Sequence, residues 1–106
     1  MNAQWARENK SMAKGYWIGR VDVKNVEGMK QYASGNPPIF KKFGGRYLVR
    51  SDKCEIPEGN SRARQVVVEF PDYASAVACY HSPEYQANIQ ARKPHAVIDL
   101  VIVEGI

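Results

Sequence analysis

The chain has 106 residues, of which 44% are hydrophobic and 25% charged, and its 15 basic and 11 acidic residues give a net charge of +4. These values are typical of one ordinary globular domain. The positive charge is spread along the chain, so we expect no nucleic-acid partner. No stretch approaches the ~20 apolar residues that span a membrane, and the polar N-terminus does not resemble a signal peptide, so we expect a cytoplasmic protein without a membrane partner.

Residues 1–13 are polar, and we interpret them as an N-terminal extension of a single domain that spans residues 14–106. Trp5 is the one large apolar side chain of the extension. We expect an extended start or a tail that packs on the surface of the domain. The alternative is a tail whose Trp5 reaches a partner subunit.

Residues 16–24 alternate between apolar and polar side chains, which predicts a first strand. Asn25 then has the side chain of a helix N-cap, and apolar residues follow at helical spacing. Gly35 predicts the end of this helix, because two prolines without a backbone N–H come soon after it. A second short helix is expected to begin at these prolines and to end at Gly44 and Gly45.

Residues 46–56 and 64–70 predict a second and a third strand, which the turn sequence between them joins into a hairpin. The β-branched run in residues 64–70 is the clearest strand signal of the chain. The outer part of the hairpin, residues 51–62, is polar and is expected to project from the domain.

Two further helix starts follow the hairpin. Asp72 is expected to cap one helix, with Tyr73, Val77 and Tyr80 on its buried stripe. Ser82 is expected to cap the next, because proline and glutamate follow it directly. Residues 97–104 alternate again and predict the last strand.

The resulting β-α-β-β-α-β order predicts an α+β, ferredoxin-like fold, in which helices cover one face of an antiparallel sheet and the first and third strands are central. The face expected under the helices is apolar: Trp17, Val21, Val23, Tyr47, Val49, Val66, Val68, Phe70, Ile98, Leu100 and Ile102. The opposite face mixes Ile18, Leu48, Val67, Val97, Val101 and Val103 with Arg20, Asp22, Arg46, Arg50, Gln65, Glu69 and Asp99. A solvated face is usually more polar, so we expect this one to join two subunits into a homodimer.

Five short stretches, in this order, resemble the family called domain of unknown function 1330: GYWI at 15–18, FGGRYLVR at 43–50, VEFP at 68–71, SPEYQ at 82–86 and DLVIVEG at 99–105. The resemblance covers about residues 14–105 and implies the dimeric α/β-barrel fold. It implies no single activity, because the wider superfamily holds cofactor-independent monooxygenases, lactone isomerases, haem enzymes and catalytically silent members.

The charged residues of the mixed face are the first candidate site. Arg20 and Arg50 are expected to bind a carboxylate, because two guanidinium groups can hold it through paired hydrogen bonds. Glu69 and Asp99 lie on the same predicted face, and a partly buried carboxylate there would have a raised pKa and could transfer a proton. The alternative is an ion-pair network that only seals the dimer.

Aromatic and titratable residues of the helices are the second candidate site. Tyr80 and Tyr85 belong to an aromatic group that lines either a ligand pocket or a plain core. His81 is a weak candidate for proton transfer and Glu69 another, whereas Cys79 is expected to be a buried small side chain and not a nucleophile. The spacing of histidine and cysteine predicts no metal site, and no cofactor motif is present.

These observations lead to the expectation of a homodimer that binds a small organic ligand, anionic or aromatic, without a cofactor. Two alternatives remain open at this stage. One is a cofactor-independent monooxygenase or isomerase, and the other is a catalytically silent assembly protein.

Overall fold

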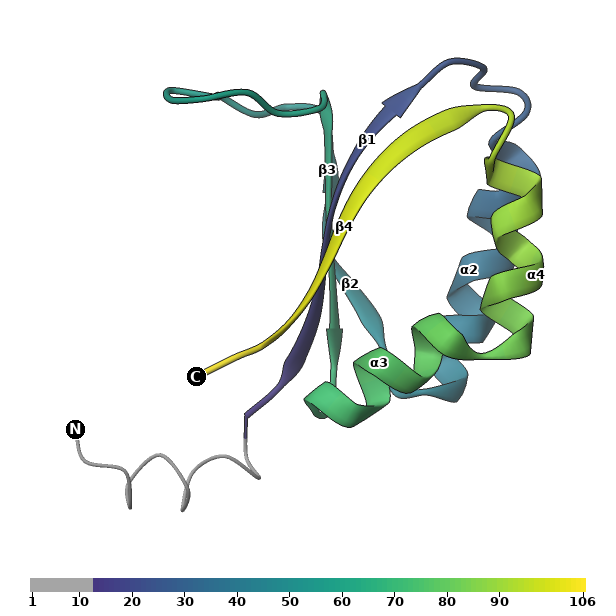
Figure 1. Cartoon of the computed structure of the whole chain (residues 1–106), viewed down its shortest axis with the longest axis vertical. Helices are drawn as coiled ribbons and strands as arrows, with labels where there is room; N and C mark the ends of the chain where they lie inside the picture. Colours follow the sequence, from purple (N-terminus) through teal and green to yellow (C-terminus); the bar gives the residue numbers. More distant parts are fainter. Residues whose placement is uncertain (1–12) are drawn as a thin grey trace.

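The computed structural model describes residues 13–106, which form a single sheet with helices against one of its faces (Figure 1). The predictions made for residues 1–12, including the role of Trp5, lie outside the described residues. The elements, in chain order, are β1 (Gly15–Val23), α2 (Lys30–Lys42), β2 (Arg46–Ser51), β3 (Arg64–Phe70), α3 (Tyr73–His81), α4 (Pro83–Arg92) and β4 (Ala96–Glu104).

The sheet has four antiparallel strands in the order β2-β3-β1-β4, so β1 and β3 are central. This arrangement confirms the predicted α+β, ferredoxin-like fold. We call the face that packs against the helices the covered face and the opposite one the open face. The segment of residues 52–63 between β2 and β3 projects on the side of the open face, as the sequence predicted (Figure 1).

The two predicted helix caps of the C-terminal half are both present. The Asp72 carboxylate accepts a hydrogen bond of 2.7 Å from the backbone N–H of Ser75 at the start of α3. The Ser82 hydroxyl accepts one of 3.2 Å from the N–H of Tyr85 in the first turn of α4, where Pro83 occupies the first helical position. Each cap satisfies an N–H that the helix itself leaves without a partner.

The prediction of two separate helices between β1 and β2 is wrong. Asn25 accepts a hydrogen bond from the N–H of Gly28, but it begins a turn, and α2 starts only at Lys30. From there α2 continues through Pro37 and Pro38 to Lys42. The two prolines remove two N–H donors from the helix, which costs free energy. Packing against α4 offsets this cost, because it supports the helix at this point.

Contacts between α2 and α4 explain why Gly35 is part of the helix and not its end. The side-chain amide of Asn88 in α4 donates to the backbone oxygen of Tyr32 at 3.1 Å and to the side-chain oxygen of Asn36 at 2.8 Å. A Cβ atom added at Gly35 would lie 2.8 Å from the Asn88 oxygen. The glycine therefore allows the close approach of two helices.

A bulge in β2 reverses two side chains relative to the prediction. The pairing with β3 shifts between Tyr47 and Val49, so that Val49 lies opposite Val67 and Arg50 opposite Val66. An inserted residue moves every later side chain to the other face. Val49 therefore belongs to the open face and Arg50 to the covered face, whereas the sequence pattern predicted the reverse. The strand also ends at Ser51, earlier than predicted.

Trp17 is the centre of the core on the covered face. Its ring is 3% exposed, contacts the rings of Phe40 and Tyr85 at centroid distances of 5.1 and 4.8 Å, and donates its N–H to the Ala76 oxygen at 2.8 Å. This close approach of α3 to β1 leaves room only for small side chains. Ala76 is therefore buried, and Tyr73 is 43% exposed and not on the buried stripe as predicted.

Candidate functional site

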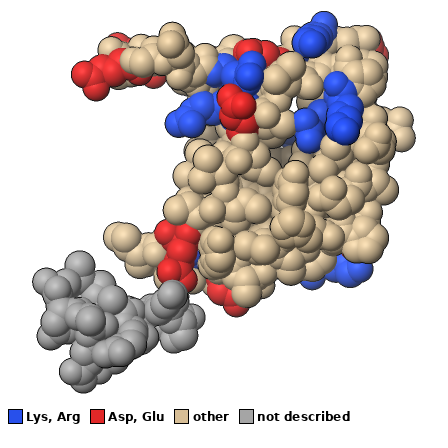
Figure 2. All heavy atoms as spheres, in the orientation of Figure 1, with Lys and Arg blue, Asp and Glu red and all other residues tan. Residues whose placement is uncertain are grey.

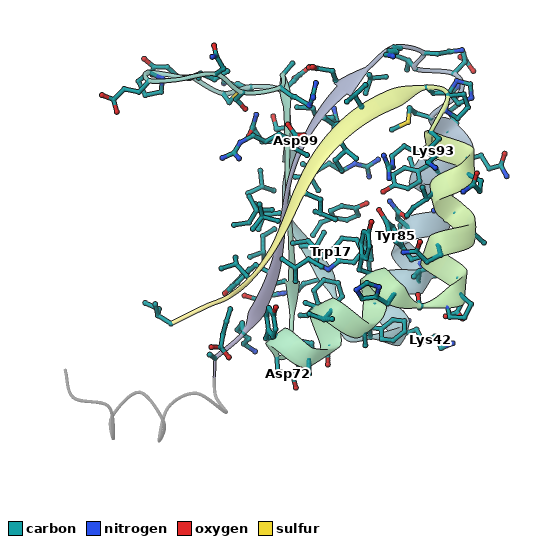
Figure 3. The ribbon with its side chains drawn as sticks, in the orientation of Figure 1. Trp17, Lys42, Asp72, Tyr85, Lys93 and Asp99 are labelled. Carbon is teal, nitrogen blue, oxygen red and sulfur yellow. The ribbon has the colours of Figure 1, made fainter. Side chains whose placement is uncertain are left out.

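A cavity of about 320 Å³ lies between the covered face and helices α2 and α4. In Figure 3, Trp17 from the sheet and Tyr85 from α4 both occupy the space between these layers. The lining residues Val23 and Val26 are 38% and 73% exposed, so the cavity opens to solvent beside the turn that follows β1. Its walls are mostly apolar, which suits the body of a small organic molecule.

Gly19 in the middle of β1 provides part of the cavity floor. A Cβ atom added there would lie 3.4 Å from a methyl group of Ile98 and 3.6 Å from one of Leu100, which are ordinary contacts. A Cβ atom therefore fits at this position, and a longer side chain is expected to extend into the cavity that Gly19 lines. Gly19 itself places no side-chain atoms in the space above the sheet.

A pair of tyrosines from the two helices provides two of the hydroxyl groups of the cavity wall. The hydroxyl oxygens of Tyr32 in α2 and Tyr85 in α4 are 2.5 Å apart. Burial and the neighbouring Tyr32 raise the pKa of Tyr85, so its hydroxyl is neutral at physiological pH. Only one of the two hydroxyl protons lies in the hydrogen bond between the tyrosines. The other hydroxyl proton is therefore available for a hydrogen bond to a ligand oxygen.

The charged groups that line the cavity are all positive. Among the described residues they are Lys30, Arg50, Arg64 and Arg92, and the lining contains no Asp, Glu or His. Within residues 13–106, the three arginines form no ion pair. The Cζ atom of Arg50 lies 5.1 Å from the centroid of the Tyr47 ring, and the Cζ atom of Arg92 lies 5.5 Å from the centroid of the Tyr32 ring.

The structure distributes the predicted site residues over two places. Arg50 and Tyr85 line the cavity, and Tyr80 packs against Tyr85 at a centroid distance of 5.5 Å without lining it. Arg20, Glu69 and Asp99 lie on the open face. The sequence pattern placed Arg20 and Arg50 together, but the bulge in β2 separates them by the thickness of the sheet.

Glu69 is held by neighbours on the open face. Its carboxylate accepts a hydrogen bond of 3.1 Å from the Tyr16 hydroxyl and bonds of 3.3 and 3.2 Å from the guanidinium of Arg46. The Tyr16 hydrogen bond first, and then Arg46, lower the pKa of Glu69. This direction is opposite to the raised pKa that we expected from the sequence, because hydrogen bonds to the charged form outweigh desolvation.

Asp99 belongs to a second cluster, at the base of the projecting segment. The Arg62 guanidinium donates to Asp99 at 3.0 Å and to Asp22 at 2.9 Å. Arg20 lies opposite Asp99 in the strand pairing but makes no ion pair within the described residues. Glu69 pairs with Tyr16, which is four residues from Arg20 along β1, so the two clusters are roughly 13 Å apart along the strand.

Cys79 and His81 do not come together as a reactive pair. Cys79 is fully buried in α3, and burial raises the pKa of its thiol to about 12, as expected of a structural cysteine. His81 is exposed at the end of α3 and does not line the cavity. Across residues 13–106, no three His, Cys, Asp or Glu side chains are grouped in a way that could hold a metal ion.

The sequence resemblance is borne out by a family model. The model of the domain of unknown function family DUF1330 matches residues 14–106 of this chain. The chain belongs to the DUF1330 family. A search of curated protein sequences finds no match. Among the helices described here, none has the length and apolar character that crossing a membrane requires.

Solved structures share the fold of this DUF1330 protein at low sequence identity. A protein of unknown function from Rhodopseudomonas palustris matches with a TM-score of 0.72 and 15% identity, over 97% of this chain and 90% of that one. SnoaB, a cofactor-independent oxygenase from Streptomyces nogalater, matches with a TM-score of 0.63 and 11% identity, over 86% and 91%. A dabb family protein with a ferredoxin-like fold from Mesorhizobium loti matches with a TM-score of 0.59 and 14% identity, over 89% and 96%.

Sequence reasoning missed two residues that shape the cavity of this DUF1330 protein. Gly19 lies among larger side chains in β1, and glycine within a strand often marks a place where a ligand or another backbone approaches closely. Arg92 follows Tyr85 and Ile89 on the buried side of α4, where a charged residue is unexpected. Both signals were present in the sequence, but only the structure shows that the two residues line the same cavity.

Proposed function

We propose that this DUF1330 protein binds a small, largely apolar organic molecule in the cavity, and that it does so as a homodimer joined through the open face. The cavity is the observation that carries the first part. Its volume of about 320 Å³ lies at the lower end of the roughly 300–1,000 Å³ of small-molecule sites. The cavity opens to solvent and its walls are mostly apolar, so an apolar molecule that displaces water from them gains free energy.

The walls favour a flat aromatic ligand. Rings of Trp17, Phe40 and Tyr47 contribute to them, and the hydroxyl groups of Tyr32 and Tyr85 add a polar point. Aromatic rings stack on such walls or meet them edge to face. A ligand with an aromatic body and an oxygen substituent would therefore match both features.

Filling the cavity from its floor tests this part of the proposal. We expect the neutral aromatic probe 4-nitroanisole to bind the wild type, and Gly19→Leu to abolish binding while leaving the circular-dichroism spectrum unchanged. Ala87→Leu is the matched control, because it adds a similar volume at an exposed position of α4. Ligand-observed NMR measures binding, and equal binding by Gly19→Leu and the wild type would rule out this cavity as the site.

A continuous apolar row on the open face supports the homodimer. Val49 pairs with Val67, Val67 with Ile18, and Ile18 with Val101, so four aliphatic side chains cross all four strands at one level. Val49 and Val101 are 41% and 55% exposed in the single subunit. The carboxylates beside this row already have partners within their own subunit, so a second copy could cover the face without burying unpaired acidic groups.

A charge placed in this row tests the homodimer. We expect sedimentation equilibrium to show a dimer for the wild type and a monomer for Val101→Asp, because an interface cannot bury an unpaired carboxylate. Val26→Asp is the control, since Val26 is 73% exposed but lies in the turn after β1 and not on the open face. A wild type that is monomeric at micromolar concentration contradicts this part of the proposal.

A cofactor-independent oxygenase or isomerase is the second candidate. The fold likeness to SnoaB and the tyrosine hydroxyl pair in the cavity favour it. The test is oxygen consumption by the protein with an electron-rich polyphenol in the absence of added metal, compared with Tyr85→Phe. Consumption that depends on Tyr85 would support an enzyme, whereas binding without turnover supports the first proposal.

A further inference from the structure

Arg92 is buried beside a mostly apolar cavity and forms no ion pair within the part of the chain that the structure describes. The residue is only 9% exposed, lies in the last turn of α4, and its Nε atom has no hydrogen-bond partner. Its guanidinium lies against the Tyr32 ring and lines the cavity. The lining residues Val26 and Lys30 are exposed, whereas Arg92 is buried. Arg92 therefore contributes its positive charge to a part of the cavity that is less accessible to water.

Among residues 13–106, no acidic group lines the cavity or forms an ion pair with Arg92. The titratable groups of the cavity are three tyrosines, from α2, β2 and α4, and three further cations, from α2, β2 and β3: Tyr32, Tyr47, Tyr85, Lys30, Arg50 and Arg64. Burial raises the pKa values of Tyr47 and Tyr85, so both are uncharged at neutral pH. The carboxyl end of α4 contributes at most about half a negative charge.

An arginine that is buried without a partner costs free energy, and proteins normally pair such a charge. Two observations here point to a ligand as the missing partner: the buried Nε atom without a hydrogen-bond partner among the described residues, and the cavity that Arg92 lines. A neutral apolar ligand would leave the cost in place. A ligand with a negative oxygen would remove it through charge-assisted hydrogen bonds, which are stronger than neutral ones.

We propose that the cavity holds its ligand as an oxyanion, that is, an aromatic carboxylate or an ionised phenol or enol whose oxygen lies against Arg92. This inference rests on the proposed function, because it specifies the charge of the molecule bound in the same cavity. For a phenol, the O–H bond breaks, both electrons remain on the phenol oxygen, and the proton leaves to water. The described lining of the cavity contains no Asp, Glu or His that could act as a base for this step, and its role is to stabilise the anion.

The consequence is a lower pKa for a phenol bound in the cavity. A cation next to an ionisable group lowers its pKa by roughly 1–3 units, and each unit corresponds to a tenfold preference for the ionised form. The phenolate is therefore expected to bind roughly 10-fold to 1,000-fold more tightly than the neutral phenol. Such a site would also favour carboxylates over the corresponding amides.

The test uses 4-nitrophenol, whose neutral and ionised forms differ in visible absorbance. We expect the pKa of the probe to fall by at least about one unit with saturating wild-type protein. Arg92→Met is expected to abolish most of this shift, because methionine keeps part of the side-chain volume and removes the charge. Lys93→Met is the matched control, since it removes a charge from the exposed neighbouring position, and it should keep the wild-type shift.

The methyl ether 4-nitroanisole separates the two proposals, because it has the same ring and cannot ionise. If 4-nitroanisole binds the wild type and the pKa of 4-nitrophenol does not fall, the oxyanion proposal is wrong and the proposed function stands. If neither probe binds, both fail. Arg92→Met must still bind 4-nitroanisole, which shows that its cavity is intact; if it does not, Arg92→Gln replaces it. An unaltered shift in a variant with an intact cavity overturns the role of Arg92.

Discussion

Both faces of the sheet carry charged residues, but these residues are paired differently on the two faces. On the open face, Asp22, Glu69 and Asp99 are each bonded to an arginine of the same subunit. Beneath the helices, the cavity has four cations and no carboxylate among the described residues. In Figure 2, the charged side chains gather mainly toward the end with the projecting segment, and the middle of the view is uncharged.

The difference suggests that the two faces have different uses. A face whose carboxylates already have partners can be covered by another subunit without leaving a carboxylate unpaired. On the covered face, Arg92 is a buried cation with no ion pair among the described residues, and an anion would reduce the cost of burying it. Under our proposals, the open face would join subunits and the covered face would bind the ligand, and each of the following predictions tests this contrast.

The largest expected effect is on the core of the covered face. Trp17→Ala should lower the free energy of unfolding by about 3–5 kcal/mol, because a buried ring is removed and the cavity grows. Val101→Ala on the open face should cost less than about 1 kcal/mol at concentrations where the subunit is monomeric, since this residue is 55% exposed. Urea unfolding measures both, and equal effects would contradict the view that only the covered face holds the subunit together.

The next largest effect on stability concerns the contact between α2 and α4, the two helices that cover the cavity. Asn88→Ala removes the hydrogen bonds to the Tyr32 and Asn36 oxygens and should cost about 1–3 kcal/mol. Gln90→Ala, at an exposed position of the same helix, should change stability by less than about 0.5 kcal/mol. Urea unfolding separates the two variants, and an effect of Asn88→Ala no larger than that of Gln90→Ala would mean that this contact does not support α2 across its prolines.

The smallest effect is a pH dependence on the open face. The Ala63 N–H first, and then Arg62, lower the pKa of Asp22. Because the folded pKa is lowered, the stabilisation is complete above the ordinary pKa of about 3.9 and is lost as the pH falls through the folded value.

Arg62→Met should raise the pKa of Asp22 only part of the way to its ordinary value, because the backbone hydrogen bond remains. Carboxyl NMR titration measures the change. Glu69 is the internal control, since its pKa is lowered by Tyr16 and Arg46 instead. A pKa of Asp22 that is the same in Arg62→Met and the wild type would show that the ion pair contributes nothing.

Most of the fold could be predicted because its signals are local. The caps at Asp72 and Ser82 and the alternation in β1, β3 and β4 depend on neighbouring residues alone. The continuous α2 could not be predicted, because the support that carries it past Pro37 and Pro38 comes from Asn88, about 50 residues later. Local propensity argued for a break, and tertiary packing decided otherwise.

The candidate site was predicted less well, for a geometric reason. A single bulge in β2 transfers Arg50 to the covered face, and strand alternation gives no sign of it. The aromatic walls around Tyr85 were anticipated as pocket or core, but no pattern shows that Gly19 leaves open space above the sheet. Cavities depend on which side chains are absent between elements, so they follow from the assembled fold.

The most direct test of the central claim compares two arginines in the ligand-free protein by urea unfolding at one subunit concentration. Our account predicts that Arg62→Met lowers the unfolding midpoint, because Arg62 has two carboxylate partners. It predicts that Arg92→Met keeps or raises the midpoint, because removing a buried charge without a partner relieves a cost. If Arg92→Met destabilises the protein as much as Arg62→Met does, then Arg92 is structural, and the contrast between the two faces does not hold.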